Sequence, residues 1–86
     1  MNTYRLIIST PDGNMLDEQV ISILVRGSEG DLAVLAGHAP FITYVKPCDC
    51  CIDLADGTER VGHLEGGLLS VSEMQTTLLS GSFKWK

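Results

Sequence analysis

Short apolar segments separated by turn residues run through the whole chain. Three of them, residues 4–9, 20–26 and 41–46, are rich in the β-branched and aromatic residues that favour strands. Shorter segments of the same kind cover residues 32–35, 52–54, 58–64, 68–71 and 75–79. No segment carries a sustained 3.6-residue period with helix caps. The pattern therefore predicts an all-β protein, either a sandwich or a barrel.

Turn residues mark the ends of these segments. Turns are predicted at residues 11–14, 55–57, 65–67 and 72–74. Pro47 is expected to end the strand over residues 41–46, because proline cannot donate to a strand ladder. Two loops, over residues 27–31 and 37–40, flank the short segment 32–35. Because so few residues separate them, we expect both loops near the same end of a sheet.

Some strands are apolar on both faces. Five of the six residues from Val20 to Val25 are apolar, although a half-buried strand should alternate apolar with polar residues. Residues 6–8 and 41–42 show the same excess. One explanation is a barrel end that folds over itself. The other is a face that a partner protein covers, because large apolar patches are rarely left exposed.

Length and charge narrow the possible functions. The chain has 86 residues, which suits one domain with one modest core, and its net charge of −5 argues against nucleic acid or an anionic lipid surface as a partner. No apolar run approaches the roughly 20 residues of a membrane span, and no signal peptide is evident. An odd count of three cysteines also fits a reducing compartment, so we expect a cytoplasmic location.

The order of several motifs carries a resemblance. Gly-Ser-Glu-Gly-Asp-Leu at residues 27–32 and Gly-His-Ala-Pro-Phe at residues 37–41 are the most specific. Tyr-Arg-Leu at 4–6 precedes them, and Glu-Gly-Gly-Leu-Leu-Ser-Val at 65–71 follows. In this order, the motifs resemble the amino-terminal domain of the epsilon subunit of bacterial F-type ATP synthases. Cys48, Ala33 and Ala36 depart from the residues frequent in that family, which affects local turns and not the fold.

The resemblance implies a flattened β-sandwich or barrel of about ten short, mostly antiparallel strands. It implies a non-catalytic domain of the rotor stalk that binds the gamma subunit and the ring of c subunits, without a cofactor, at the inner face of the cell membrane. The c-ring contacts carried over are Glu29, Gly30, Asp31, His38, Ala39 and Pro40. The gamma contacts carried over are Thr10 and Thr43.

Two further expectations concern the isolated domain. The family continues into a helical hairpin that inhibits ATP hydrolysis, whereas this chain ends at residue 86, so we expect it to bind gamma without inhibiting hydrolysis. Its apolar excess also makes self-association plausible when the domain is isolated. The last segment, which contains Phe83 and Trp85, either forms a short strand or frays.

The three cysteines offer an alternative function, a small β-barrel that binds a metal or exchanges electrons through its thiols. Cys48, Cys50 and Cys51 would need His63 as a fourth zinc ligand. However, the neighbours Cys50 and Cys51 point to opposite faces of a strand, so small buried side chains are the simpler interpretation.

An enzyme has less support. His38 lacks the nucleophile and carboxylate partners of a catalytic histidine, and a hydrogen bond that holds its loop or a contact with a partner is the simpler role. Glu29 and Asp31 are expected in an exposed loop, where burial cannot separate their pKa values for acid–base chemistry.

Overall fold

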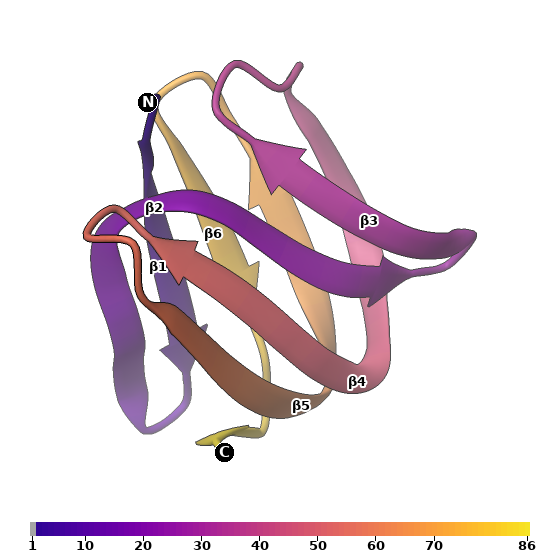
Figure 1. The fold of residues 1–86 in the computed structure, drawn as a ribbon. Coiled ribbons are helices and arrows are strands. Elements are labelled where there is room, and N and C mark those ends of the chain that lie inside the picture. Colours follow the sequence, from indigo (N-terminus) through magenta and orange to yellow (C-terminus); the bar gives the residue numbers. More distant parts are fainter. Residues whose placement is uncertain (1) are drawn as a thin grey trace.

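Seven strands and no helix make up the part of the chain that the computed structural model describes, residues 2–86 (Figure 1). In chain order they are β1 (Tyr4–Thr10), β2 (Gly13–Gly27), β3 (Gly30–Leu35), β4 (Phe41–Leu54), β5 (Glu59–Val71), β6 (Gln75–Leu79) and β7 (Phe83–Trp85). Within these residues there is therefore no helix of the length and apolar character that crosses a membrane.

The three long strands bend and each takes part in two packed layers. One layer contains β1, β6, the first halves of β2 and β4, and the second half of β5. The other contains β3, the second halves of β2 and β4, the first half of β5, and β7. Among the strands of residues 2–86, β1 and β6 are the one pair that runs in parallel. The predicted all-β sandwich is therefore confirmed, while the expected ten strands are seven, because β2, β4 and β5 each supply a segment to both layers.

The hydrophobic core lies between the two layers, which pack against each other through it. Alternation along the strands points one set of apolar side chains inward, as a pleated strand requires. The buried apolar residues are Leu6, Ile8, Leu16, Val20, Ile23, Val25, Val34, Val45, Cys50, Ile52, Leu54, Leu64, Leu69, Val71, Leu78 and Phe83. The Tyr4 hydroxyl on β1 donates to the Val34 carbonyl on β3 at 2.7 Å, which joins the two layers by a hydrogen bond.

The bends in β4 and β5 explain two wrong predictions. Pro47 does not end its strand, because it lies in a stretch of β4 that pairs with Glu65 on β5 but has no partner on β2. Gly66 and Gly67 do not form a turn, because β5 continues through them. Gly66 has φ +107°, and a Cβ on Gly67 would collide with the Leu79 carbonyl oxygen, so the corner between the layers requires both glycines.

The last segment forms a strand that is fixed on β5. The Phe83 ring is buried over Gly62, and its edge contacts Trp85 at 4.9 Å between ring centroids. The Arg60 guanidinium lies 3.7 Å from the Trp85 ring centroid. The Lys86 amide donates to the Val61 carbonyl at 2.9 Å. Of the two possibilities left open by the sequence, the structure shows a short strand rather than a frayed tail.

Candidate interaction site

The β2–β3 hairpin presents an acidic tip. Gly27 and Gly30 face each other in the register, so Ser28 and Glu29 form the turn. Gly30 has φ +124°, which glycine tolerates and other residues rarely adopt. Glu29, Gly30 and Asp31 are all exposed. Asp31 accepts a long hydrogen bond from Arg26 Nε at 3.4 Å, and an exposed pair of this kind contributes little stability. The tip can therefore offer its carboxylates to a partner.

The loop over residues 36–40 is held by its own histidine. The His38 amide donates to the Leu35 carbonyl at 3.2 Å, and His38 Nδ1 lies 2.8 Å from the Ala39 carbonyl oxygen, which makes Nδ1–H the donor. The His38 ring packs on Phe41 with 4.8 Å between ring centroids. This geometry matches the expected structural role of His38. His38, Ala39 and Pro40 are exposed, so the loop surface is free to meet a partner as well.

The two loops leave opposite ends of β3. The hairpin tip precedes Gly30 and the second loop follows Leu35, so the prediction that both lie at one end of a sheet is wrong. The six residues of β3 separate them by roughly 17 Å at the usual rise of a strand. The start of β4, which follows the second loop, lies beside the hairpin, since Phe41–Thr43 and Gly27–Leu32 line one open hollow of about 460 Å³.

Thr10 and Thr43 lie in the same layer, on β1 and β4. The Thr10 hydroxyl donates to the Gly13 carbonyl at 3.2 Å and accepts from the Asp12 amide at 3.1 Å, so it closes the β1–β2 turn. Thr43 lies between the exposed Ile42 and Tyr44, and strand alternation therefore points it to the other side, into the hollow beside the hairpin. The structure places both threonines at accessible edges of this layer.

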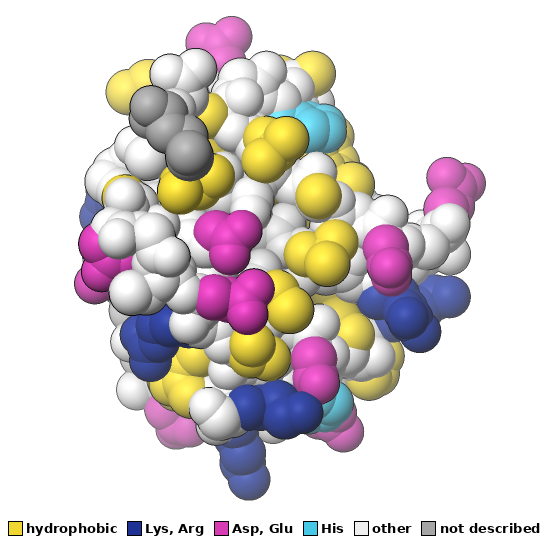
Figure 2. All heavy atoms as spheres, in the orientation of Figure 1, with side chains coloured by type: hydrophobic (Ala, Val, Ile, Leu, Met, Phe, Trp, Pro, Cys, Tyr) yellow, Lys and Arg dark blue, Asp and Glu magenta, His cyan; other side chains and the backbone are white. Residues whose placement is uncertain are grey.

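The layer that contains β1 and β6 carries exposed apolar side chains on its outer side. Tyr44 on β4 is opposite Leu68 on β5, which is opposite Leu79 on β6. The exposed fractions are 76% for Tyr44, 68% for Ile42 and 47% for Leu79. We call Ile42, Tyr44, Leu68 and Leu79 the apolar face. The other layer mixes its exposed apolar residues with acidic and basic side chains (Figure 2). Exposed apolar side chains are therefore present on both layers, with Leu24 and Leu35 exposed by 41% and 56% on the other layer.

A charged cluster joins β4, β5 and the end of the chain. His63 Nδ1 lies 2.8 Å from Asp49 Oδ1, and His63 Nε2 lies 2.7 Å from Glu65 Oε2. Both ring nitrogens can donate only when the imidazole is protonated, and hydrogen bonds to Asp49 and then Glu65 raise the pKa of His63. Lys86 Nζ contacts Asp49 Oδ2 at 2.9 Å. Hydrogen bonds from Lys86 and then His63 lower the pKa of Asp49. This cluster ties the chain end to the sheet.

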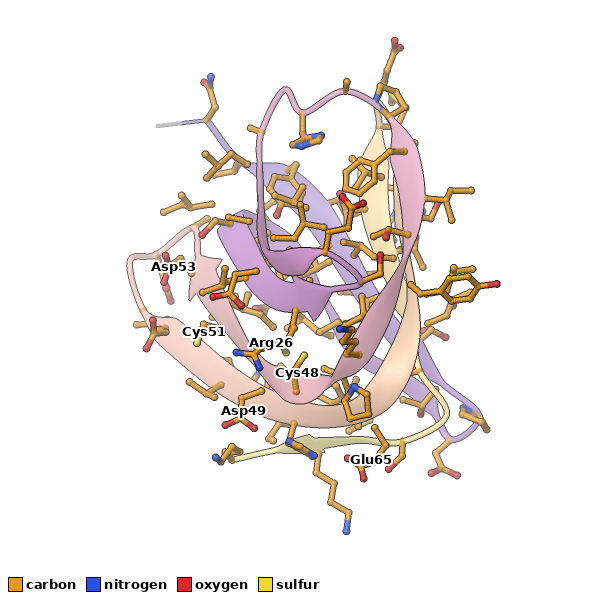
Figure 3. All side chains as sticks on the ribbon, turned by 90° about the vertical axis from the view of Figure 1, so that its right-hand side faces the viewer. Arg26, Cys48, Asp49, Cys51, Asp53 and Glu65 are labelled. Atoms are coloured by element: carbon orange, nitrogen blue, oxygen red, sulfur yellow. The ribbon has the colours of Figure 1, made fainter. Side chains whose placement is uncertain are left out.

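The cysteines do not converge. Cys50 points into the core and is fully buried, whereas Cys51 faces outward and is partly exposed, as strand alternation predicted. Burial raises the pKa of the Cys50 thiol to about 11, which makes it a poor nucleophile or ligand at neutral pH. Figure 3 shows Cys48 and Cys51 apart along β4. Among residues 2–86, no group of three His, Cys, Asp or Glu side chains is arranged to hold a metal ion.

Comparison with known proteins decides the family. Residues 3–86 match the family described as the ATP synthase delta/epsilon chain β-sandwich domain. The chain belongs to this family. The resemblance drawn from the motifs at residues 27–32 and 37–41 is therefore confirmed. The comparisons support a delta/epsilon-type domain and give no support to the alternative of a thiol-based metal or redox protein.

One relative in sequence and two solved structures are similar to this chain. The chain is 35% identical over 83 residues to the sodium-ion-specific ATP synthase epsilon chain of Acetobacterium woodii, a match that covers 96% of this chain and 62% of that protein. The fold is similar to a chain of the Euglena gracilis mitochondrial ATP synthase, with TM-score 0.91, 22% identity and coverage of 96% of this chain and 53% of that one. A chain of the Tetrahymena thermophila mitochondrial ATP synthase, from a central stalk and c-ring structure, gives TM-score 0.82 and 12% identity over 95% and 66%.

Sequence reasoning missed two parts of this delta/epsilon-type surface. The apolar face was expected only in general, because the alignment of Tyr44 with Leu68 and Leu79 depends on cross-strand register, which one sequence does not reveal. The sequence suggested His63 as a fourth ligand of a zinc site, yet it lies between two carboxylates. The spacing of His63 and Glu65, two residues apart on one face of a strand, was an available signal for half of this contact.

Proposed function

We propose that this chain is a non-catalytic domain of the rotor stalk of an ATP synthase, where it links the gamma subunit to the ring of c subunits. The observation that carries the proposal is the match of residues 3–86 to the delta/epsilon β-sandwich family. In this role the domain supports the coupling of ion flow to ATP synthesis by being held between two partners. It would lie at the membrane surface on the cytoplasmic side as part of the complex.

The gamma subunit, in this proposal, covers the layer formed by β1, β6, β4 and β5. Thr10 and Thr43 lie on two strands of that layer. Ile42 and Tyr44 point to its outer side, whereas Thr43 between them points into the hollow beside the hairpin, so gamma would reach Thr43 from the edge of β4. An apolar surface suits a long-lived contact, because obligate interfaces are more hydrophobic than transient ones. Since Tyr44 is 76% exposed without a partner, covering it would remove a large apolar area from water.

The ring of c subunits is proposed to meet the hairpin tip and the loop over residues 36–40. Glu29 and Asp31 supply two carboxylates at the tip, and His38, Ala39 and Pro40 supply a second surface. Carboxylates of this kind suit basic or amide-rich loops and give orientation more than affinity. Two contacts at opposite ends of β3 would also resist rotation of the domain against the ring.

The gamma contact is tested by binding with matched variants. Tyr44→Lys places a charge in the apolar face, and Met74→Lys places the same charge at a turn residue that is 85% exposed. Each protein is mixed with purified gamma subunit at micromolar concentration and analysed by size-exclusion chromatography. We expect a stable complex for the wild type and for Met74→Lys, and a complex weakened at least tenfold for Tyr44→Lys. A wild-type chain that does not bind gamma would refute the proposal.

A further inference from the structure

Among residues 2–86, strand edges without a partner occur at β3, at β7 and along the start of β4, and the edge of β3 is the longest one formed by a whole strand. Of the seven strands that residues 2–86 form, only β3 and β7 pair with a single neighbour, β2 and β5 respectively. β7 has three residues, and its Lys84 and the following Lys86 place positive charges at that edge. β3 has six residues and lies at the rim of its layer with only β2 beside it (Figure 1). The backbone groups on its far side have no strand partner.

The edge of β3 lacks the features that usually prevent pairing. Natural edge strands are protected by lysine, proline, a bulge or short length. β3, with the sequence Gly-Asp-Leu-Ala-Val-Leu, contains neither lysine nor proline. Its register with β2 runs without a shift from Gly30 to Leu35, so there is no bulge. Ala33 and Leu35 are exposed, Leu35 at 56%. The edge is therefore regular and largely apolar, and apart from the Leu35 carbonyl, which accepts from the His38 amide at 3.2 Å, its far side has no backbone partner from another strand of residues 2–86.

We propose that a second copy of this chain adds its own β3 to this edge in antiparallel orientation. With Ala33 on the two-fold axis, Asp31 of each copy lies opposite Leu35 of the other. Asp31 is the one charged residue of β3, so no like charges are opposed in this register. Each Asp31 also keeps its contact with Arg26, which lies on the same chain. A two-fold interface must be self-complementary, and this register meets that requirement because each Asp31 faces an apolar residue of the other copy.

The size and charge of this interface predict a weak dimer that salt strengthens. One six-residue strand pair is small beside a standard interface of roughly 1,600 Å². We therefore expect half of the chains to be paired only at about 0.1 mM. Each chain has a net charge of −5, so two copies repel one another at long range. Salt screens that repulsion, so a higher salt concentration should favour the dimer.

The test uses two variants that add the same charge. Ala33→Lys would oppose two lysines across the axis, whereas Ala55→Lys changes an exposed residue of the β4–β5 turn. Sedimentation velocity is measured from about 10 µM to 1 mM at low and high salt. We expect the wild type and Ala55→Lys to dimerise alike, and Ala33→Lys to dimerise at least tenfold less. Hydrogen exchange of the wild type should slow with concentration in β3.

Three results would overturn the proposal. They are a wild type that stays monomeric at 1 mM, an Ala33→Lys variant that dimerises like Ala55→Lys, and slowed exchange confined to the apolar face. In that last case Tyr44→Lys would abolish the dimer, whereas a dimer that pairs through β3 would still form in Tyr44→Lys. The proposal does not rest on the rotor-stalk function, because gamma binding is scored on Tyr44→Lys and dimerisation on Ala33→Lys. Either can fail without the other.

Discussion

The contact between Gly62 and Phe83 fixes the last strand, and Gly62→Ala tests it. Gly62 faces Trp85 in the register of β5 with β7, and the Phe83 ring lies directly over it. A Cβ added at Gly62 would come within 2.9 and 3.0 Å of two ring carbons of Phe83 and closer still to a third. Because Phe83 is only 6% exposed, its ring must move against packed neighbours to make room.

The expected loss of stability follows from this crowding. One extra methyl in a well-packed core costs about 1–3 kcal/mol, so we expect Gly62→Ala to lower the free energy of unfolding by about 2 kcal/mol. Complete expulsion of the ring would approach the roughly 3–5 kcal/mol of a buried phenylalanine lost to alanine. At about 4–8 °C per kcal/mol for a domain of this size, the melting temperature should fall by roughly 8–16 °C.

The assay combines urea unfolding with tryptophan fluorescence. Trp85 is the single tryptophan and lies on β7, so its emission should shift to longer wavelength if the strand loosens. Gly81→Ala is the control, because nothing lies within 4 Å of a Cβ there. Phe83→Leu removes the clashing ring atoms, so Gly62→Ala should cost much less in that background. Equal stability of the two alanine variants, or an unchanged cost beside Leu at position 83, would refute the reasoning.

Three further predictions follow from single contacts. Tyr4→Phe removes the hydrogen bond to the Val34 carbonyl and should lower the free energy of unfolding by about 1 kcal/mol in urea titrations. Asp49 and Glu65 raise the pKa of His63. The stability that the protonated imidazole gives the fold is therefore fully present below the unfolded pKa of about 6.5 and is lost as pH rises through the folded pKa. His63→Gln should therefore show a flatter profile of melting temperature against pH. Thiol labelling should modify Cys48 and Cys51 in the folded protein and Cys50, whose pKa burial raises to about 11, only after unfolding.

Each of these has a clear opposing result. An unchanged unfolding midpoint for Tyr4→Phe would mean that water replaces the bond between the layers without cost. A wild-type profile parallel to that of His63→Gln between about pH 6 and 9 would show that the carboxylates do not hold the protonated imidazole. Fast labelling of all three thiols in the native protein would show that Cys50 is not protected in the core.

Local signals in the sequence predicted where most of the strands lie, but they did not predict the long-range geometry. Residues 4–9 and 75–79 were predicted almost to their bounds, because their alternation and turn residues are local. Pro47 and the pair Gly66 and Gly67 were misread as strand ends. The structural role of these residues depends on the bend that carries β4 and β5 between the layers, where a missing amide hydrogen or Cβ is an advantage. Such a bend is set by partners far away in the chain.

The same limit applies to the candidate site. The residues of the hairpin tip and of the loop over 36–40 were found from their motifs, and the structure shows them exposed. Their positions at opposite ends of β3 could not be read from their closeness in sequence. The first half of β2 was also missed, because Asp17, Glu18 and Gln19 are polar. Asp17 accepts two hydrogen bonds from Arg5 on β1, a cross-strand pair that appears only once the strands are in register.

The position of the domain in an assembled ATP synthase tests the central claim most directly. We propose to purify the complex that contains this chain and to determine its structure by cryo-electron microscopy. The account predicts that the β-sandwich lies between the gamma subunit and the ring of c subunits, with Glu29 and Asp31 toward the ring and Tyr44 covered by gamma. A domain located away from the central stalk, or one whose apolar face stays open to solvent in the complex, would contradict it.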